Sequence, residues 1–534
     1  MNKNIFIDPA YKWKSYSAGE YQVHFVGREK TARELLSLLT QNAPPGNAKF
    51  ISGLLGLTGN FAAIVDAPGW VLAVADKIRA HPVCYVEREG AFGVSNSARL
   101  LRETFKLTEP DDLSVLEFQM AGYVTGRDTL FKNLHQMQAG EFMVWDKKES
   151  KLKRERYYLF YSEKMREEPE EGLIGELDEI TTNTFKRVIE DVDGRPIWIP
   201  LSGGLDSRLV ACKLKELGHD DLHTYSYGPP GNYEAKTAEI VAKQLGVPWT
   251  FIPILRKDMR KFFWSQDRKT YTAFADHLSV MPIFQDISVQ NERKYKKIVP
   301  EDAVFINGQS GDFITGGHVP EGLTAPDAAL SDVLRAVVDK HFSLWKNLKS
   351  PENIHKIETK IKELLSYELK DMDGCRLFQL LELWEWQERQ CKYVVNNVRI
   401  YEYLNYSWQM PLWSDEYLLY WREIPVEFKL NQNLYKKYLR KYNHKNLFKD
   451  FERTVWRWPG MTRAVVPMAR LIGLIAGKNA KESFYDYMRY FGHYSFQYGA
   501  YPYSYFFKHA KNARNPISFF VKSWLEENMN RETG

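Results

Sequence analysis

The sequence predicts a layered, strand-rich α+β domain, followed by an α/β domain with a parallel sheet and a helical C-terminal extension. Two observations predict this order. Short β-branched or aromatic runs separated by Gly, Pro and Asp turns fill the first 160 residues, and strands alternate with helices from about residue 175. A chain of 534 residues is also long enough for two domains.

The N-terminal domain, 1–165, is predicted from five short runs with the composition of strands. These runs lie at 21–27, 60–66, 69–76, 84–89 and 91–96. The polar stretch 163–172 breaks the pattern, and we interpret it as a linker to the second domain, 166–534.

The second domain is predicted from alternating strands and helices. Strands are expected at 197–201, 223–228, 249–254 and 303–308, with helices at 207–218, 234–246 and near 277–294. This alternation indicates a parallel sheet with helices on both faces, and such sheets bind ligands beyond the carboxyl ends of their strands. The remainder, 325–534, is expected to be helical and aromatic.

Composition excludes several classes of protein. The net charge of +5, from 73 basic and 68 acidic residues, is too small to predict a nucleic-acid partner. Four cysteines without a CxxC pair exclude a disulfide scaffold and a zinc ribbon, and they fit a reducing cytosol. The sequence starts without an apolar leader, and the apolar run 464–477 is too short to span a membrane and carries Arg470. We therefore expect a cytoplasmic protein with no integral membrane segment.

The strongest chemical signal is the segment PLSGGLDSR at 200–208, where a predicted strand turns into a helix. Its glycines allow the backbone to approach a ligand, and the helix N-terminus presents N–H groups to an anion. Ser202 and Ser207 can add hydroxyl donors, and Asp206 can hold Mg²⁺ on phosphates. No lysine follows in the G-x-x-x-x-G-K spacing, so this is not a Walker loop. The bland alternative is a tight turn that requires small residues.

This loop resembles the pyrophosphate-binding loop of ATP pyrophosphatase (PP-loop) enzymes, in the form found in the asparagine synthetase family. The segments YSYG (225–228), NGQSGD (307–312), Glu388-Arg389 and PLWSD (411–415) are similar to further segments of that family. The resemblance implies an adenine nucleotide alpha hydrolase-like fold, with ATP and Mg²⁺ as cofactors and with Asp206 and Asp312 as the metal ligands. The residues that it implies for ATP binding are Leu201, Ser202, Gly203, Gly204, Asp206, Ser207, Tyr227, Gly228, Asn307 and Gly308.

The N-terminal domain resembles the later part of an Ntn-type class II glutamine amidotransferase domain, through segments at 59–62, 75–76, 81–85 and 129–140. Such domains use an N-terminal cysteine as nucleophile, whereas Asn2 stands here and the first cysteine is Cys84. We therefore expect a degenerate domain that does not release ammonia from glutamine. The chain also resembles β-lactam and carbapenam synthetases, in which a comparable N-terminal domain without glutaminase activity supports the synthetase domain.

Two departures concern the second half of the reaction. Asparagine synthetases carry Glu where this chain has Gln309, and a neutral amide cannot act as general base near pH 7. Glu388 and Glu402 are candidates to take the proton instead. The family's late lysine is absent from 453–458, where Arg457 or Arg453 can supply the positive charge. The predicted catalytic residues are therefore Asp206, Gln309, Glu388 and Arg457.

The resemblance implies an AMP-forming carbon–nitrogen ligase. It adenylates a carboxylate, releases pyrophosphate and couples the acyl group to ammonia or an amine. The carboxylate belongs to a small molecule such as a secondary metabolite, a sugar uronic acid or a peptide. The basic segment 431–470 is either a solvated helical face or a collar for a polyanionic substrate, and the aromatic stretch 485–507 either packs between helices or stacks on sugars or bases. The second alternative for each segment favours a large acidic or carbohydrate substrate. Whether a separate glutaminase supplies ammonia stays open. The alternatives are a non-catalytic ATP-binding scaffold and a PP-loop enzyme that acts on tRNA.

Overall fold

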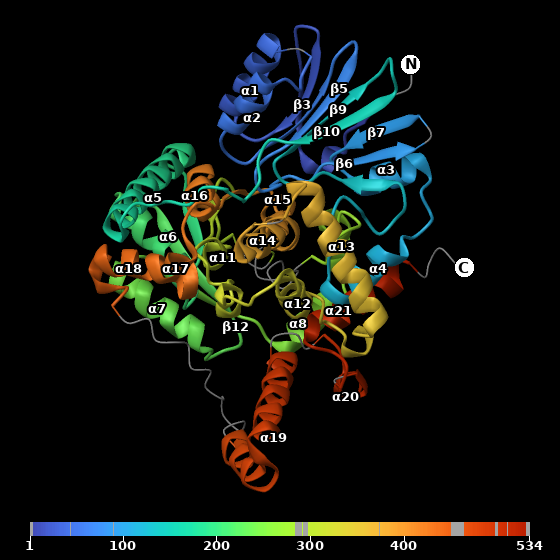
Figure 1. Ribbon diagram of the computed structural model, residues 1–534. Helices are drawn as coiled ribbons and strands as arrows, with labels where there is room; N and C mark the ends of the chain where they lie inside the picture. The colour runs from blue at the N-terminus through green and yellow to red at the C-terminus, as the bar shows by residue number, and fades with distance from the viewer. Residues whose placement is uncertain are drawn as a thin grey trace.

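The computed structural model describes residues 4–529 except 43, 89, 283–290, 292–296, 373, 450–463, 497–499 and 510. The described residues form three β-sheets. Two sheets make up the N-terminal domain at the top of Figure 1, and the third lies in the domain below it. The predicted order of an α+β domain followed by an α/β domain is confirmed.

The N-terminal domain stacks a four-stranded sheet on a six-stranded sheet. The first has the order β1-β7-β6-β8 and the second the order β10-β9-β5-β4-β3-β2. The strands are β1 (Ile5–Phe6), β2 (Lys14–Ala18), β3 (Tyr21–Val26), β4 (Ala62–Asp66), β5 (Trp70–Ala75), β6 (Cys84–Arg88), β7 (Ala91–Ser95), β8 (Leu134–Gln136), β9 (Glu141–Asp146) and β10 (Lys151–Arg156). All five predicted runs are strands.

Side chains that point alternately to the two faces of each strand form the layers of the N-terminal domain. In β4, Ile64 belongs to a core between the two sheets, whereas its neighbours Ala63 and Val65 belong to the main core beneath the helices. Successive side chains of a strand point to opposite faces, so a strand buried on both faces has apolar residues throughout. The helices of this domain are α1 (Glu29–Asn42), α2 (Ala48–Gly56), α3 (Ala98–Phe105) and α4 (Asp112–Ala121).

The second domain is built on a parallel sheet of the order β13-β12-β11-β14-β15. All its pairings are parallel, as the alternation of strands and helices predicts. The strands are β11 (Ile197–Pro200), β12 (Leu222–Gly228), β13 (Trp249–Pro253), β14 (Val304–Ile306) and β15 (Ser407–Gln409). β15 is an edge strand that the sequence analysis missed, because three residues inside a helical region carry too little pattern.

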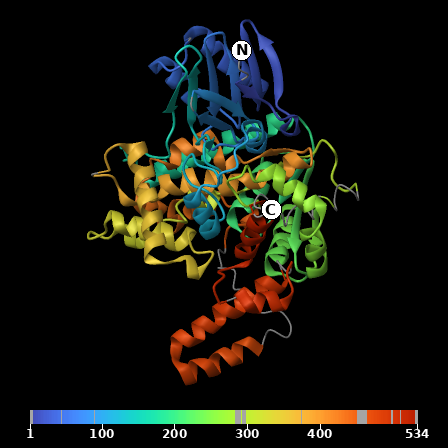
Figure 2. The ribbon, with the colours of Figure 1, turned by 90° about the vertical axis from the view of Figure 1, so that its right-hand side faces the viewer.

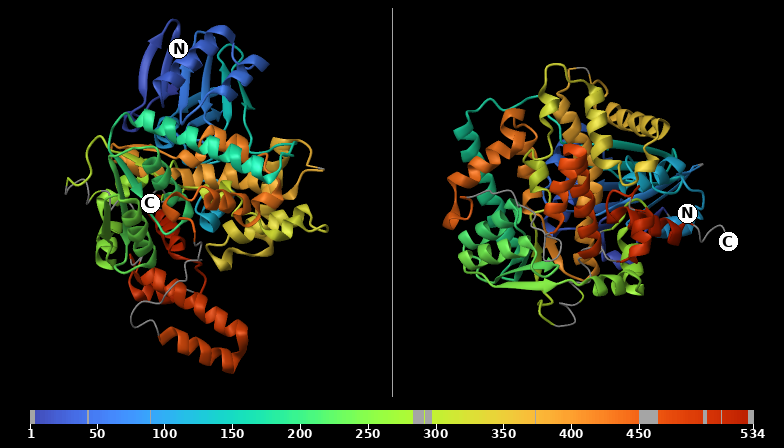
Figure 3. Two further views of the ribbon diagram at one scale, coloured as in Figure 1. Left: turned by 90° about the vertical axis from the view of Figure 1, so that its left-hand side faces the viewer. Right: turned by 90° about the horizontal axis from the view of Figure 1, so that it is seen from below.

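Helices pack around this sheet and extend beyond it (Figure 3). They are α5 (Glu170–Val192), α6 (Leu205–Glu216), α7 (Tyr233–Leu245), α8 (Arg256–Phe263), α9 (Gln266–Ala275), α11 (Gly311–Ile314), α12 (Leu330–His341), α13 (Pro351–Leu369), α14 (Leu377–Trp384), a π-helix (Glu385–Val394), α15 (Arg399–Tyr403), α16 (Asp415–Trp421), α17 (Val426–Lys429), α18 (Asn433–Lys441), α19 (Val465–Phe496), α20 (Tyr503–His509) and α21 (Pro516–Asn528). None of the described helices is long and apolar enough to cross a membrane.

One predicted helix is wrong over its first part. Residues 277–282 of the expected helix near 277–294 form a turn and an isolated bridge from Val280 to Tyr123. His277 and Leu278 have φ values of 44° and 53°, which a right-handed helix excludes. Most of the remaining predicted stretch lies outside the described residues.

Segments distant in sequence join the two domains. The C-terminal helix α21 packs on α4, with the rings of Phe118 and Trp524 4.9 Å apart. Lys77 Nζ lies 2.6 Å from Asp415 Oδ1, while Asp415 Oδ2 accepts from the Gly59 N–H at 2.8 Å. Asp415, in the segment similar to the synthetase family, therefore fastens the N-terminal domain. The predicted boundary at 165/166 falls between β10 and α5.

Candidate active site

The conformation of the loop between β11 and α6 is fixed by hydrogen bonds to its own serine hydroxyl groups. The Ser202 N–H donates to Ser207 Oγ at 3.0 Å, the two hydroxyl oxygens lie 2.9 Å apart, and the Gly204 N–H donates to Ser202 Oγ at 3.1 Å. Among the described residues, no side chain caps the first turn of α6. Its N–H groups therefore remain available to an anion, as the loop prediction requires.

Arg208 braces this loop from behind. Its guanidinium donates to the Gly203 carbonyl at 2.9 Å and to the Leu447 carbonyl at 2.8 Å, which ties the loop to the segment that follows α18. Arg208 is only 8% exposed, so we interpret it as a structural residue that supports the loop through these two carbonyl groups.

The loop after β14 lies directly against the loop after β11. A Cβ on Gly308 would lie 2.7 Å from the Ser207 nitrogen, and a Cβ on Gly311 would lie 2.5 Å from Asp206 Cγ. Only glycine fits at such distances, so these two positions let the second loop close over Asp206. The structure thus brings Asp206 and the Asp312 loop together at one edge of the sheet.

Asp206 lies in an unfavourable place for a negative charge. Burial and the nearby Asp312 carboxylate raise its pKa from 3.8 to about 7, although the hydroxyl of Tyr435 donates to Oδ1 at 3.0 Å. A cation bound between the two carboxylates would relieve both causes.

The donor set at this position fits Mg²⁺. No group of three or more metal-ligating His, Cys, Asp or Glu side chains occurs among the described residues. Zinc and calcium sites draw most of their ligands from protein, whereas Mg²⁺ is often held by one or two carboxylates together with phosphate oxygens and water. Asp206 and Asp312 supply that number.

Asp312 is linked to a buried charge network. His318 Nε2 lies 3.3 Å from Asp312 Oδ2, and its Nδ1 lies 2.6 Å from Glu385 Oε2. On the far side, His341 Nε2 and Lys340 Nζ both lie 2.7 Å from Glu385 Oε1. Burial opposes the charge on His318, but its hydrogen bonds to the two carboxylates outweigh burial and raise its pKa to about 9. His318 is therefore a cation next to the proposed metal ligand.

The acceptor side of the loop carries unpaired polar atoms. Asn307 Oδ1 accepts from the Gln309 N–H at 3.1 Å, while Asn307 Nδ2 and Gln309 Oε1 are buried and have no partner among the described residues. Ser310, with φ of 63°, donates to Gln390 Oε1 at 2.7 Å and fixes the turn. Buried polar atoms without partners are uncommon, and here they suit a ligand.

Tyr227 and Gly228 end β12, next to the loop. Ser226 donates to the Leu201 carbonyl at 2.6 Å, and the Leu201 N–H donates to the Tyr225 carbonyl at 2.8 Å. The predicted nucleotide residues of three neighbouring strands therefore share one sheet edge. Their individual contacts to ATP stay predictions.

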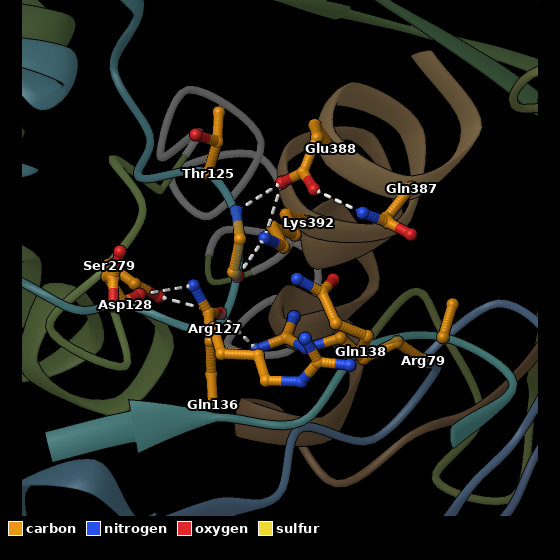
Figure 4. Close-up of polar contacts among 12 residues, drawn as sticks. Arg79, Thr125, Arg127, Asp128, Gln136, Gln138, Ser279, Gln387, Glu388 and Lys392 are labelled. Carbon is orange, nitrogen blue, oxygen red and sulfur yellow. Dashed lines mark hydrogen bonds and ion pairs between the residues drawn. The ribbon is translucent and has the colours of Figure 1, made fainter. Parts of the chain in front are cut away.

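The partners of Glu388 lie in the π-helix and in the N-terminal domain. Figure 4 shows Glu388 on the π-helix, facing Lys392 and the backbone of the N-terminal domain. Its carboxylate pairs with Lys392, and it accepts from the Gly126 N–H at 2.8 Å and from Gln387 Nε2 at 2.7 Å. These contacts connect the domains, and among the described residues Glu388 makes no hydrogen bond or ion pair with Asp206. The catalytic role of Glu388 stays a prediction, and Arg453 and Arg457 lie outside the described residues.

Glu402, the other candidate proton acceptor, lines a cavity of about 570 Å³ between the domains. It pairs with Arg399, with His81 at 3.2 Å and with the Trp408 indole at 3.1 Å. The Arg399 cation, only 1% exposed, keeps the pKa of Glu402 low, although burial opposes this effect. A carboxylate held in this way is a weak proton acceptor.

Tyr435, His318 and Glu385 contact the candidate site but were not predicted from the sequence. His318 follows the Gly-Gly pair of the second loop, so its spacing from Asp312 offered a signal. Tyr435 offered none, because it reaches Asp206 from α18 only through folding.

A parallel sheet whose carboxyl edge carries a Gly-rich loop and two carboxylates defines a nucleotide-binding α/β domain. Residues 186–447 match the family model for asparagine synthase. Residues 186–447 are therefore a domain of the asparagine synthetase family, whose members form amide bonds with ATP, typically together with Mg²⁺.

Two solved structures are similar to longer parts of the chain. One is the glutamine phosphoribosylpyrophosphate amidotransferase of B. subtilis in complex with ADP and GMP; it is 9% identical, with a TM-score of 0.17, over 69% of this chain and 77% of that chain. The other is an allosteric regulatory enzyme of purine biosynthesis; it is 10% identical, with a TM-score of 0.19, over 72% of this chain and 79% of that chain. Such low TM-scores support no further argument. No curated protein matches the sequence.

Proposed function

We propose that this protein is an AMP-forming synthetase that adenylates a carboxylate and couples it to ammonia or an amine. The observation that carries the proposal is the meeting of Asp206 and Asp312 beside the uncapped N-terminus of α6. This arrangement suits the pyrophosphate group of a nucleotide. Asparagine synthase domains use ATP to form amide bonds.

In the first half-reaction, the substrate carboxylate attacks the α-phosphorus of ATP and pyrophosphate leaves. The N–H groups at the start of α6, together with the hydroxyls of Ser202 and Ser207, hold the departing pyrophosphate. Mg²⁺ held by Asp206 and Asp312 would supply charge neutralisation on the phosphates. The His318 cation lies beside this carboxylate pair and adds positive charge.

In the second half-reaction, the amine attacks the acyl carbon, the amide bond forms, and AMP leaves with the bonding electron pair. The amine loses one proton, which Gln309 cannot take and which passes to the phosphate of the leaving AMP or to water. The buried Oε1 of Gln309 can instead accept a hydrogen bond from the amine N–H and orient the lone pair toward the acyl carbon.

The N-terminal domain is proposed to lack glutaminase activity. Cys84, the cysteine in residues 1–165, is fully buried in β6, and burial raises the pKa of its thiol to about 12. Such a thiol is a poor nucleophile at neutral pH. The amine then enters from solution or from a separate glutaminase, and the carboxylate is proposed to belong to a sugar uronic acid, a peptide or a secondary metabolite.

One observation favours a second candidate, an ATP-binding scaffold without acyl transfer. Gln309 stands where asparagine synthetases carry the glutamate that can accept a proton. Among the described residues, neither Glu388 nor Glu402 contacts Asp206 or Asp312. Nucleotide binding and pyrophosphate release separate the two candidates.

The test begins with calorimetric binding of α,β-methylene-ATP and Mg²⁺ to the full chain and to Asp206→Ala. The synthetase proposal expects Mg²⁺-dependent binding that the variant loses, followed by carboxylate-dependent pyrophosphate release in a substrate screen. Binding without release for any carboxylate class favours the scaffold. Absence of binding by the wild type overturns both candidates.

A further inference from the structure

Helix α19 forms a hairpin that projects from the body, on the side away from the N-terminal domain (Figures 1 and 2). Gly477, with φ of 84° and ψ of 176°, breaks the helix into two arms. A Cβ on Gly473 of the first arm would lie 3.1 Å from Lys481 Cδ of the second arm, so the arms contact each other near the turn.

The first arm exposes large aliphatic side chains. Leu474 is 85% exposed and Ile475 78% exposed, next to the turn, and Leu471 and Met468 follow with 58% and 53%. Spacings of three, four and seven residues place Met468, Leu471 and Ile475 on one face of the helix, with Leu474 at its border. Ala469, on another face, is fully buried. The exposed side chains form a continuous apolar stripe, whose usual function is to contact a partner surface.

Cations border this apolar stripe. Arg470 lies beside it on the same arm and is exposed, and Lys478 follows the turn with 85% of its side chain exposed. Lys478 approaches Glu482 only to 3.9 Å, so this contact leaves its charge largely unpaired. The tip therefore combines apolar side chains with positive charge, the composition of segments that lie in the headgroup region of a bilayer.

We propose that the tip of the α19 hairpin docks on an anionic lipid surface, with Met468, Leu471, Leu474 and Ile475 inserted among the headgroups. Arg470 and Lys478 would contact lipid phosphates. The hairpin does not span the bilayer, because no described helix is long and apolar enough. This inference is independent of the proposed amide chemistry.

A second copy of the chain fits the stripe less well. Four aliphatic side chains cover only part of the about 800 Å² that each partner buries in a stable interface. A symmetric contact through this tip would also bring like charges of the two hairpins together. An anionic bilayer meets both the apolar and the cationic parts of the tip.

The experiment measures co-flotation of the full chain, without nucleotide, on vesicles of phosphatidylcholine with and without phosphatidylglycerol. The docking proposal expects binding that rises with the anionic lipid and falls with salt. The variant Leu474→Ser/Ile475→Ser should weaken it at least tenfold, and Lys478→Glu should weaken it and reduce its salt dependence. The matched control is Ile240→Ser, at a 65% exposed aliphatic position on α7, which should bind like the wild type.

Because the replaced side chains are exposed, the variants should keep the melting temperature of the wild type, and this is measured in parallel. Absence of wild-type binding overturns the proposal, as does equal binding by the Leu474/Ile475 variant. It is also overturned if light scattering finds a wild-type dimer that this variant dissociates, since the stripe is then an interface between copies. Loss of nucleotide binding would refute the proposed function while leaving vesicle docking unaffected.

Discussion

Asp206 should decrease the stability of the ligand-free protein above neutral pH, and Asp206→Asn should remove this effect. Burial and Asp312 raise the pKa of Asp206 from 3.8 to about 7. A carboxyl group whose pKa is raised in the folded state contributes its full stability below the unfolded pKa of 3.8, and this contribution is lost progressively as pH rises from there to about 7.

The magnitude follows from the proton that the folded state retains. Between pH 5 and pH 7 the folded carboxyl is largely protonated, whereas the unfolded one is ionised. Two pH units at 1.36 kcal/mol per unit give at most about 2.7 kcal/mol, and less where water reaches the side chain. At about 2.1 cal/mol/K per residue over roughly 370 residues, this energy corresponds to about 3 °C in melting temperature.

The assay is calorimetric melting in EDTA at pH 5 and pH 8. The melting temperature of Asp206→Asn minus that of the wild type should be larger at pH 8 than at pH 5, by up to about 3 °C. The control is Asp220→Asn, whose carboxyl is 94% exposed and whose difference should not change with pH. Saturating Mg²⁺ and α,β-methylene-ATP should then raise the melting temperature of the wild type alone. If the difference in melting temperature between Asp206→Asn and the wild type is the same at pH 5 and pH 8, the raised pKa of Asp206 is refuted.

Three further predictions concern the site and the domain interface. Tyr435→Phe removes the 3.0 Å hydrogen bond to Asp206 and should weaken binding of Mg²⁺ and α,β-methylene-ATP by about three- to tenfold; unchanged calorimetric affinity would contradict this. Gly311→Ala places a Cβ 2.5 Å from Asp206 Cγ and should reduce that affinity more than tenfold, whereas Gly175→Ala, with nothing within 4 Å, should leave it unchanged. Glu388→Gln strands the buried lysine that it pairs with and should destabilise the fold by about 3–5 kcal/mol in urea titrations. Loss of turnover at full stability would instead support a catalytic Glu388.

The local elements could be predicted because each follows from a short pattern. The helix 234–246 was read from its periodicity, and α7 spans Tyr233–Leu245 between an Asn232 cap and Gly246, with φ of 71°. The position of the loop 202–207 between a strand and a helix is also confirmed, whereas the binding roles of its residues stay predictions. The predicted helix is wrong over 277–282 because His277 and Leu278 both have positive φ values, and the pattern of apolar residues gives no sign of these backbone angles.

The sequence by itself determined the order of the domains, the parallel sheet and the loop with Asp206. These depend on hydrogen bonding and periodicity within a few residues. Only the tertiary structure decided which distant side chains meet. Packing of α18 brings Tyr435 to Asp206, and the π-helix directs Glu388 into the domain interface while Glu385 reaches His318. Sequence spacing carries no such information, because the contacts depend on how elements far apart in the chain pack around a common core.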